Sequence, residues 1–194
     1  MGAADSIGEL EAGPFLTALG FSLAGRAITV RALVDAVVPI VLPLEERLLK
    51  RSRGAVTVVP MAEAPINAVT ALYKTELARS PSTTAWALLD AVSSPRFTRC
   101  PVLLSSGKVA GFLLFQIDGD VAVVHARIVA AEFKGGATNA LLMAAAVRIS
   151  QPFGVRTIEF EVPENNSDTE KLARRLAGQA IRTKDQYYRS IEPA

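Results

Sequence analysis

The sequence predicts a mixed α/β (α+β) fold, in which helices flank a central, mostly antiparallel sheet. Two observations predict it. Several segments carry apolar residues at the spacing of amphipathic helices, and others are short runs rich in β-branched residues. The strand-like runs between residues 100 and 130 follow one another through short glycine turns, which favours antiparallel pairing. With 194 residues, half of them hydrophobic, the chain is long enough for one domain with an appendage.

Residues 1–52 differ in texture from the rest and are predicted to form an N-terminal extension. It contains three predicted elements: a helix over 6–19, a hairpin over 20–30 that turns at Ala24-Gly25, and a helix over 32–50. Pro39 and Pro43 lie inside the last of these, so we expect that helix to be kinked or split. Its apolar residues need a partner surface, either on the rest of the chain or in a homodimer.

Residues 53–194 are predicted to form the main domain, because a basic stretch ends at Gly54 and a regular succession of elements follows. These elements are strand 55–60, helices 62–78 and 82–92, strands 100–104, 109–117 and 121–130, helix 140–150, strand 157–162, helix 167–177 and a hairpin-like pair over 180–191 around Lys184-Asp185. Asp118-Gly119-Asp120 joins two of the strands. An Asp-Gly pair between two apolar runs is typical of a type I′ turn, whose central residues both have positive φ.

Composition narrows the classes of function. Lys plus Arg number 21 and Asp plus Glu 19, without a dense basic block, so we expect no nucleic-acid partner. No apolar run approaches the ~20 residues that span a bilayer, and the start lacks the basic segment of a signal peptide, so we expect a cytoplasmic protein without membrane contact. The single cysteine, Cys100, excludes an internal disulfide and a thiolate zinc site. We predict no metal site and a buried, apolar environment for Cys100.

One segment carries a pattern typical of anion binding. Strand 121–130 leads through a glycine-containing turn directly into helix 140–150. The first backbone N–H groups of a helix lack intrahelical partners, and glycines let a phosphate approach the backbone closely. Lys134 adds a positive charge, and Thr138 and Asn139 add polar groups. On its own, a Lys-Gly-Gly sequence before a helix is more often a simple turn.

The surrounding residues 128–142 resemble the cofactor motif of the GCN5-related N-acetyltransferases. In that family an apolar strand end is followed by a Pro-Glu-Tyr-Arg-Gly-like turn, spaced glycines and a Leu-Leu helix. Here Glu132-Phe133-Lys134-Gly135 matches the turn, with Phe for Tyr and Lys for Arg, and the glycine spacing is one residue shorter. The order of strands and helices from residue 55 to 191 is also similar to that of the family, so the expected fold is that of a GNAT domain.

The resemblance implies a site for acetyl-CoA as co-substrate. In the family two parallel neighbouring strands, here 121–130 and 157–162, splay apart, and the cofactor lies in the gap. Backbone groups at the strand end contact pantetheine, the glycine loop holds the pyrophosphate, and an asparagine after the second strand contributes. The residues implied here are Ile128, Val129, Lys134, Gly135, Gly136, Ala137, Thr138, Asn139, Asn165 and Asn166.

The family's usual catalytic residues are missing from their expected positions. Strand 121–130 contains no carboxylate, and helix 167–177 contains no tyrosine. Three other residues are candidates, two as general base and the third as the acid that protonates the leaving thiolate: His125, Glu161 and Tyr187. Each also has a purely structural interpretation, as a buried strand histidine, as part of a solvated face shared with Glu159, and as a packing aromatic residue.

The extension carries a second resemblance. Residues 15–21, with a Leu-Gly-Phe ending, and the following 25–28 are similar to the closing helix-to-strand segment of another acetyltransferase domain. The extension is therefore either a partial acetyltransferase remnant or an unrelated appendage, and both interpretations stay open.

Taken together, the residues and the resemblance predict an acetyl-CoA-dependent N-acetyltransferase that acts by direct transfer on an unidentified amine, either a small molecule or a peptide amino group. The alternative is a catalytically inactive CoA-binding module with a regulatory or interaction role. The missing strand carboxylate and helix tyrosine favour that alternative.

Overall fold

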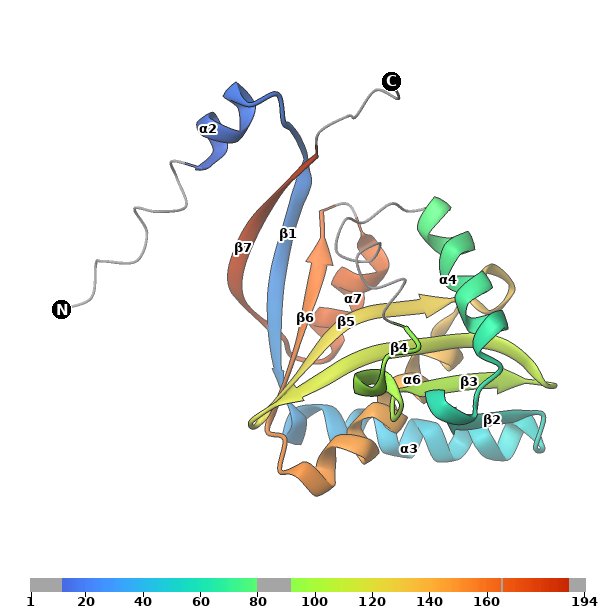
Figure 1. Ribbon diagram of the computed structural model, residues 1–194. Coiled ribbons are helices and arrows are strands. Elements are labelled where there is room, and N and C mark those ends of the chain that lie inside the picture. Colours follow the sequence, from blue (N-terminus) through green and yellow to red (C-terminus); the bar gives the residue numbers. More distant parts are fainter. Residues whose placement is uncertain (1–11, 80–91, 165, 189–194) are drawn as a thin grey trace.

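The computed structural model describes residues 12–79, 92–164 and 166–188, and these form a seven-stranded sheet with the strand order β2-β3-β4-β5-β6-β1-β7 (Figure 1). The strands are β1 Ser22–Leu33, β2 Val56–Pro60, β3 Pro101–Ser105, β4 Lys108–Asp118, β5 Val121–Val129, β6 Thr157–Pro163 and β7 Gln179–Tyr188. Every neighbouring pair is antiparallel except β5 and β6, which are parallel. The predicted mixed and mostly antiparallel fold is confirmed.

The helices lie on both faces of the sheet, except for the first, which lies beyond the end of β1 (Figure 1). They are α2 Ala12–Ala18, α3 Val34–Ser52, α4 Ile66–Arg79, α6 Gly136–Ser150 and α7 Ser167–Arg175, with short 3-10 turns η1 Met61–Glu63, η2 Pro95–Phe97, η3 Ala131–Phe133 and η4 Gln151–Phe153. Helices α3 and α6 pack against each other below the sheet in Figure 1, and α4 lies on the opposite face. The predicted helix over 82–92 falls almost entirely outside the described residues.

Helix α6 provides the partner surface that the apolar residues of α3 need. Residues 140–147 of α6 are all buried, because α6 has the sheet on one side and α3 on the other. On α3 the buried Val37 and Val41 belong to the same core, and Arg148 of α6 binds the buried Glu45 at 2.8 Å. The apolar run therefore packs on the domain, while the predicted homodimer remains a prediction.

The prolines of α3 do not split it. Pro39 and Pro43 both lie inside one helix that runs from Val34 to Ser52. Each proline removes a backbone hydrogen bond, which favours a helix break. Tertiary packing supplies most of the stability of a helix in a folded protein, and the buried face of α3 on α6 outweighs that loss.

The two hairpins predicted over residues 20–30 and 180–191 are wrong. Residues 22–33 form the single strand β1, in which Gly25, with φ of 156°, lies at a bulge against β7. Lys184 and Asp185 lie inside the single strand β7, opposite Ala27 and Arg26. The two segments pair with each other rather than folding back on themselves, because β1 lies between β6 and β7 and gains hydrogen bonds on both edges.

The predicted meander β3-β4-β5 is confirmed, but its turns differ from expectation. Ser106 and Gly107, between β3 and β4, have φ of 49° and 78°, the two positive angles of a type I′ turn. Between β4 and β5, of the two central residues only Gly119 has a positive φ, 59°. A positive φ at the first central residue alone is typical of a type II′ turn, so the type I′ turn expected there is wrong.

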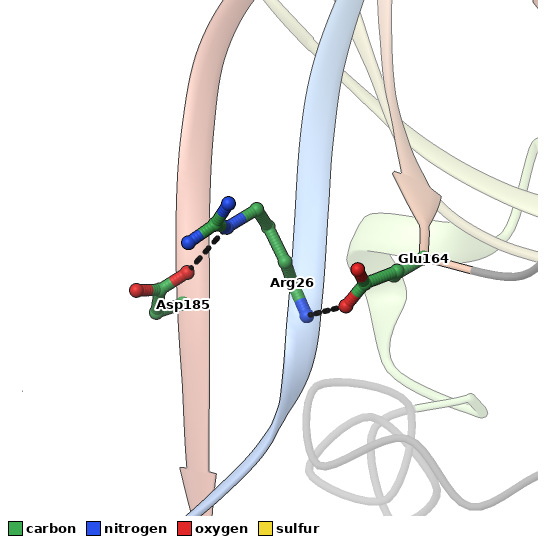
Figure 2. A network of polar contacts seen from close by, with 3 residues as sticks. All are labelled: Arg26, Glu164 and Asp185. Atoms are coloured by element: carbon green, nitrogen blue, oxygen red, sulfur yellow. Dashed lines mark hydrogen bonds and ion pairs between the residues drawn. The ribbon is translucent and has the colours of Figure 1, made fainter.

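A polar network ties β1 to both of its neighbours (Figure 2). The Arg26 guanidinium on β1 binds Asp185 on β7 at 2.8 Å. The Arg26 backbone N–H donates to the Glu164 carboxylate at 3.2 Å. The Glu164 N–H in turn donates to the Arg26 carbonyl at 2.6 Å. Glu164 directly follows β6, so this network fixes the start of the turn that leads from β6 into α7.

The predicted division into an extension, 1–52, and a domain, 53–194, coincides with a helix end. Helix α3 stops at Ser52, and Arg53 adopts a left-handed conformation with φ of 49°. The sheet nevertheless crosses this point, because β1 precedes it and lies between β6 and β7. The division itself remains a prediction.

Candidate active site

The parallel ladder between β5 and β6 is short. It ends at the pair Val124 and Phe160, whereas β5 continues to Val129 and β6 continues to Pro163. Beyond that pair the facing edges of the two strands have no ladder bonds between them. The predicted splay between these strands is therefore present, and it exposes backbone donors and acceptors that a ligand can bind.

A β-bulge at His125 explains why the strands diverge there. Leu114 on β4 pairs with Ala126, but Phe115 pairs with Val124, so His125 is the extra residue on β5. A bulge bends its strand and increases the local twist. Because it immediately follows Val124, the last β5 residue paired with β6, it turns β5 away at the point where the gap opens.

The gap is a pocket with a volume of about 370 Å³. One wall is the diverging part of β5, residues 125–129, and the opposite wall includes Glu161 of β6. Helix α4 contributes Glu76, α6 contributes Asn139 and α7 contributes Thr169. The pocket therefore combines two open strand edges with polar side chains from three helices.

The glycine loop lies at the edge of this pocket. Gly135 is the N-cap of α6, and its φ of 151° and ψ of 167° are readily adopted only by glycine. An added Cβ at Gly135 would meet no atom of the described residues within 4 Å, so among these the backbone there is open to a ligand. The unpaired N–H groups and the dipole of the following helix start favour an anion.

Lys134 and Glu76 form an ion pair at the same edge. The Lys134 ammonium lies 2.9 Å from the Glu76 carboxylate, and the two side chains are 57% and 9% exposed. The pair joins the loop before α6 to helix α4 across the pocket lining. An ammonium has three donors, so Lys134 can hold Glu76 and still bind an anion.

Two polar features of the lining suit an amide-rich and anionic ligand. The Asn139 side-chain oxygen is buried and has no hydrogen-bond partner among the described residues, so it offers an acceptor to an N–H group. On the α7 side, the Asn166 oxygen caps the helix by accepting from the Thr169 N–H at 3.1 Å, and Arg127 donates to the Thr169 hydroxyl at 3.0 Å. The lining therefore combines a buried acceptor on α6 with a guanidinium that is held at the start of α7.

His125 is half-buried and held by several groups. Its Nε2 lies 2.8 Å from the Gln116 side-chain oxygen on β4, and its ring meets the Phe97 ring edge-on at a centroid distance of 6.0 Å. Burial lowers the pKa of His125 below its usual 6.5, and the positive charge of Arg96 lowers it further, while Glu161 acts in the opposite direction. The imidazole is therefore neutral at pH 7.

The structure brings together two of the three catalytic candidates. His125 and Glu161 both line the pocket, and Glu161 lies 3.8 Å from the Lys184 ammonium of β7. Tyr187 does not line it: this residue is on β7, which β1 separates from β6, and its hydroxyl lies beside Gly13 of α2. A tyrosine two strands away from the gap is not positioned to reach a group bound between β5 and β6.

The predicted cofactor residues divide into three groups. Those that line the pocket are Ile128, Val129, Lys134, Gly135, Asn139 and Asn166. Gly136, Ala137 and Thr138 form the first turn of α6 next to it, where they contribute backbone groups, and Thr138 is buried. Asn165 lies outside the described residues. Cys100 is buried as predicted, and burial raises the pKa of its thiol to about 11.

Sequence reasoning missed Glu76, Arg127 and Gln116. Glu76 had a detectable signal, because it falls three residues after Tyr73 and one before Leu77, on the apolar face of its helix. A glutamate on a buried helix face requires a partner or a function. Arg127 and Gln116 had no such signal, since strand alternation shows neither the bulge nor the neighbours that the bulge creates.

Within the described residues, no group of side chains is arranged to bind a metal ion. None of the described helices has the length and apolar character needed to cross a membrane.

The fold resembles several solved structures, among them two that are described as GNAT proteins. A conserved protein of unknown function from Staphylococcus epidermidis aligns with a TM-score of 0.60 and 15% identity over 96% of this chain and 67% of its own. A GCN5-related N-acetyltransferase from Sphaerobacter thermophilus aligns with a TM-score of 0.58 and 18% identity over 91% of this chain and 55% of its own. A tandem GNAT protein from the clavulanic acid biosynthesis pathway gives a TM-score of 0.58 and 16% identity over 90% of this chain.

These identities support similarity of fold alone. The chain spans little more than half of the latter two proteins, 55% and 58% of their lengths. No curated protein matches the sequence. The family model for the GNAT acetyltransferases, in contrast, matches residues 66–178, which is more than half of the chain and includes β5, the glycine loop and α6. The protein therefore belongs to the GNAT acetyltransferase family.

Proposed function

We propose that the protein is an acetyl-CoA-dependent N-acetyltransferase that transfers the acetyl group directly to an amine, carried by a small molecule or a peptide. The observation that carries this proposal is the end of the β5–β6 ladder at Val124 and Phe160, beside the glycine-started helix α6. An open strand edge and a helix N-terminus lie on one pocket. Together they match a ligand with both amide and phosphate groups.

Different residues along the pocket bind different parts of acetyl-CoA in this proposal. At Ile128 and Val129 the edge of β5 that faces away from β4 has no ladder partner and is available to pantetheine amides, and the buried Asn139 oxygen accepts a further N–H. Lys134, Gly135 and the first N–H groups of α6 hold the pyrophosphate, because positive charge and unpaired donors converge there. When bound, acetyl-CoA supplies an acyl thioester that an amine can attack.

His125 and Glu161 are the residues placed to manage protons. The attacking nitrogen forms a bond to the acetyl carbon, the carbon–sulfur bond breaks, and one amine proton must leave. A neutral imidazole can accept that proton, and the lowered pKa of His125 keeps it neutral at pH 7. The Glu161 carboxylate on the facing strand stabilises the imidazolium that results. We assign no role to Tyr187.

Thiol release tests the proposal directly. The protein is mixed with acetyl-CoA and a panel of primary amines and amino-terminal peptides, and free thiol is followed over time. Release that depends on both protein and amine supports the function. The His125→Gln variant should retain CoA binding and lose about 10²-fold in rate, the lower end of general-base contributions.

A second candidate is a CoA-binding module without turnover. The observation that favours it is that no tyrosine is among the described residues that line the pocket, so the phenol that commonly protonates the leaving thiolate in the family is lacking there. A thermal shift with CoA separates the two, because a ligand at 100 times its dissociation constant stabilises by about 2.7 kcal/mol. A shift without thiol release from any amine identifies the inactive module. The absence of any shift at millimolar CoA contradicts both.

A further inference from the structure

The bulge on β5 gives the only histidine of the chain an unusual neighbour. Gln116 on β4 pairs in register with Val123, two residues before His125. Because His125 is the extra residue of the bulge, its ring is not committed to a register partner and reaches the Gln116 side chain, with Nε2 2.8 Å from Oε1. The contact joins two partly exposed side chains of neighbouring strands at the mouth of the divergence.

We infer that Gln116 is a positioning residue, which fixes His125 in the tautomer that presents Nδ1 as the proton acceptor. This inference rests on the proposed function and specifies its base. An amide oxygen can only accept a hydrogen bond, so the Nε2 atom beside it carries the hydrogen. The lone pair of the neutral ring is then on Nδ1. The assignment makes Nδ1, not Nε2, the atom that takes the amine proton.

The charged neighbours of His125 explain why an uncharged partner is required. Arg96 on η2 acts on the ring with a positive charge, and Glu161 on β6 acts with a negative one. Phe97 adds an uncharged ring edge, and Gln116 adds a neutral acceptor. A carboxylate in place of Gln116 would hold the imidazolium and remove the base at neutral pH. A glutamine orients the ring without adding charge.

The tautomer can be measured without any assumption about catalysis. His125 is the only histidine, so untagged protein labelled with ¹⁵N at histidine gives one pair of ring nitrogen signals. We expect the Nε2–H tautomer to dominate in the wild type at pH 8. In Gln116→Met, which has a similar length and no strong acceptor, we expect a mixture of tautomers and a loss of about 5-fold in kcat, with little change in the KM for acetyl-CoA.

A charge variant tests the link to turnover. In Gln116→Glu the carboxylate should raise the pKa of His125, and the acid limb of the kcat/KM profile should move to higher pH by about one to two units. Gln151→Glu is the matched control, since it adds the same charge in the exposed turn η4 at the other end of α6 from Gly135. In that control, the pKa of His125 and the acid limb of the kcat/KM profile should both stay as in the wild type.

Each result decides the inference. A dominant Nε2–H tautomer, together with a titration and an acid limb that move in step in Gln116→Glu, supports it. An Nδ1–H tautomer in the wild type, or a tautomer that Gln116→Met leaves unchanged, overturns it. If the titration of His125 moves in Gln116→Glu while the acid limb of the kcat/KM profile stays, the inference about His125 is also overturned. The proposed acetyl transfer is then unaffected. A wild type that releases no thiol overturns the proposed function itself, and with it the role of His125 as base.

Discussion

Gly111 offers the most direct test of the idea that the shape of β5 determines cofactor binding. It lies on β4 opposite Val129. A Cβ at Gly111 would be 2.7 Å from the Ile128 carbonyl oxygen and 3.3 Å from the Val129 Cα. Both are backbone atoms, so neither can rotate away as a flexible side chain would. In Gly111→Ala, β5 must therefore move at the two residues that we expect to contact pantetheine.

The expected magnitude follows from the contact. Extra volume in a packed site without room to relax costs about 1–3 kcal/mol. A chain of this length loses about 2–4 °C of thermal denaturation midpoint per kcal/mol, so a cost near 2 kcal/mol should lower the midpoint of Gly111→Ala by roughly 4–8 °C. Loss of one backbone hydrogen bond to the ligand, worth about 1 kcal/mol, should weaken CoA binding by about 5-fold.

Gly178→Ala is the control for general destabilisation. Its Cβ would collide with Val30 Cγ1 and lie 3.1 Å from the Ala173 carbonyl oxygen, but Gly178 does not line the pocket. Both variants are followed by thermal denaturation, and CoA binding is measured by calorimetry at a temperature where both are folded. We expect both to be less stable and only Gly111→Ala to bind CoA more weakly. Equal loss of affinity in the two variants, or full affinity in Gly111→Ala, would refute the reasoning.

Three further changes test other parts of the structure. Lys134→Ala should weaken CoA by about 10-fold in calorimetry but leave acetyl-pantetheine, which has no phosphate, unchanged; equal losses for both ligands would place Lys134 away from the pyrophosphate. Arg148→Met removes the cation from the buried Glu45 and should destabilise by about 1–3 kcal/mol in urea, with CoA affinity intact. Tyr187→Phe should keep kcat within about 2-fold, since the hydroxyl lies beside Gly13 and not in the pocket; a loss of 10-fold or more would restore it as a catalytic candidate.

The central part of the fold could be predicted from the sequence because its signals are local. The meander from β3 to β5 is joined by short glycine turns, whose residues accept positive φ wherever they occur. The start of α6 is likewise marked by Gly135, next to the motif that carries the family resemblance. In both places neighbouring residues and tertiary pairing favour the same conformation.

The outer strands could not be predicted in this way. Ala24-Gly25 and Lys184-Asp185 both favour a turn locally, yet each lies inside a strand. The decisive interaction is the β1–β7 ladder, which joins residues about 160 positions apart, such as Arg26 and Asp185. A local turn propensity contributes less stabilising free energy than a full antiparallel ladder, so the pairing between distant strands determines the structure.

The site residues likewise divide into those with a local sequence signal and those that only tertiary packing brings together. Ile128, Val129 and Lys134 could be found from the motif, because cofactor-binding positions follow one another along the chain. Glu76 reaches the pocket only through packing, from α4, and Gln116 on β4 is connected to it only through its contact with His125. The role of His125 depends on a one-residue bulge, and a bulge changes which side chains meet without leaving a pattern in the sequence.

The N-terminal strand has a larger part in the site than its distance from the motif suggests. All of β6, from Thr157 to Pro163, is paired with β1. This pairing continues past Phe160, where β5 departs from β6. Beyond that residue β1 is the only ladder partner of β6 among the described strands, and the Arg26–Glu164 bonds extend this support into the turn before α7. The gap therefore depends on two causes of different origin. The bulge bends β5 away, and β1 prevents β6 from following it. A strand outside the part of the chain that matches the family model thus holds one wall of the proposed acetyl-CoA site.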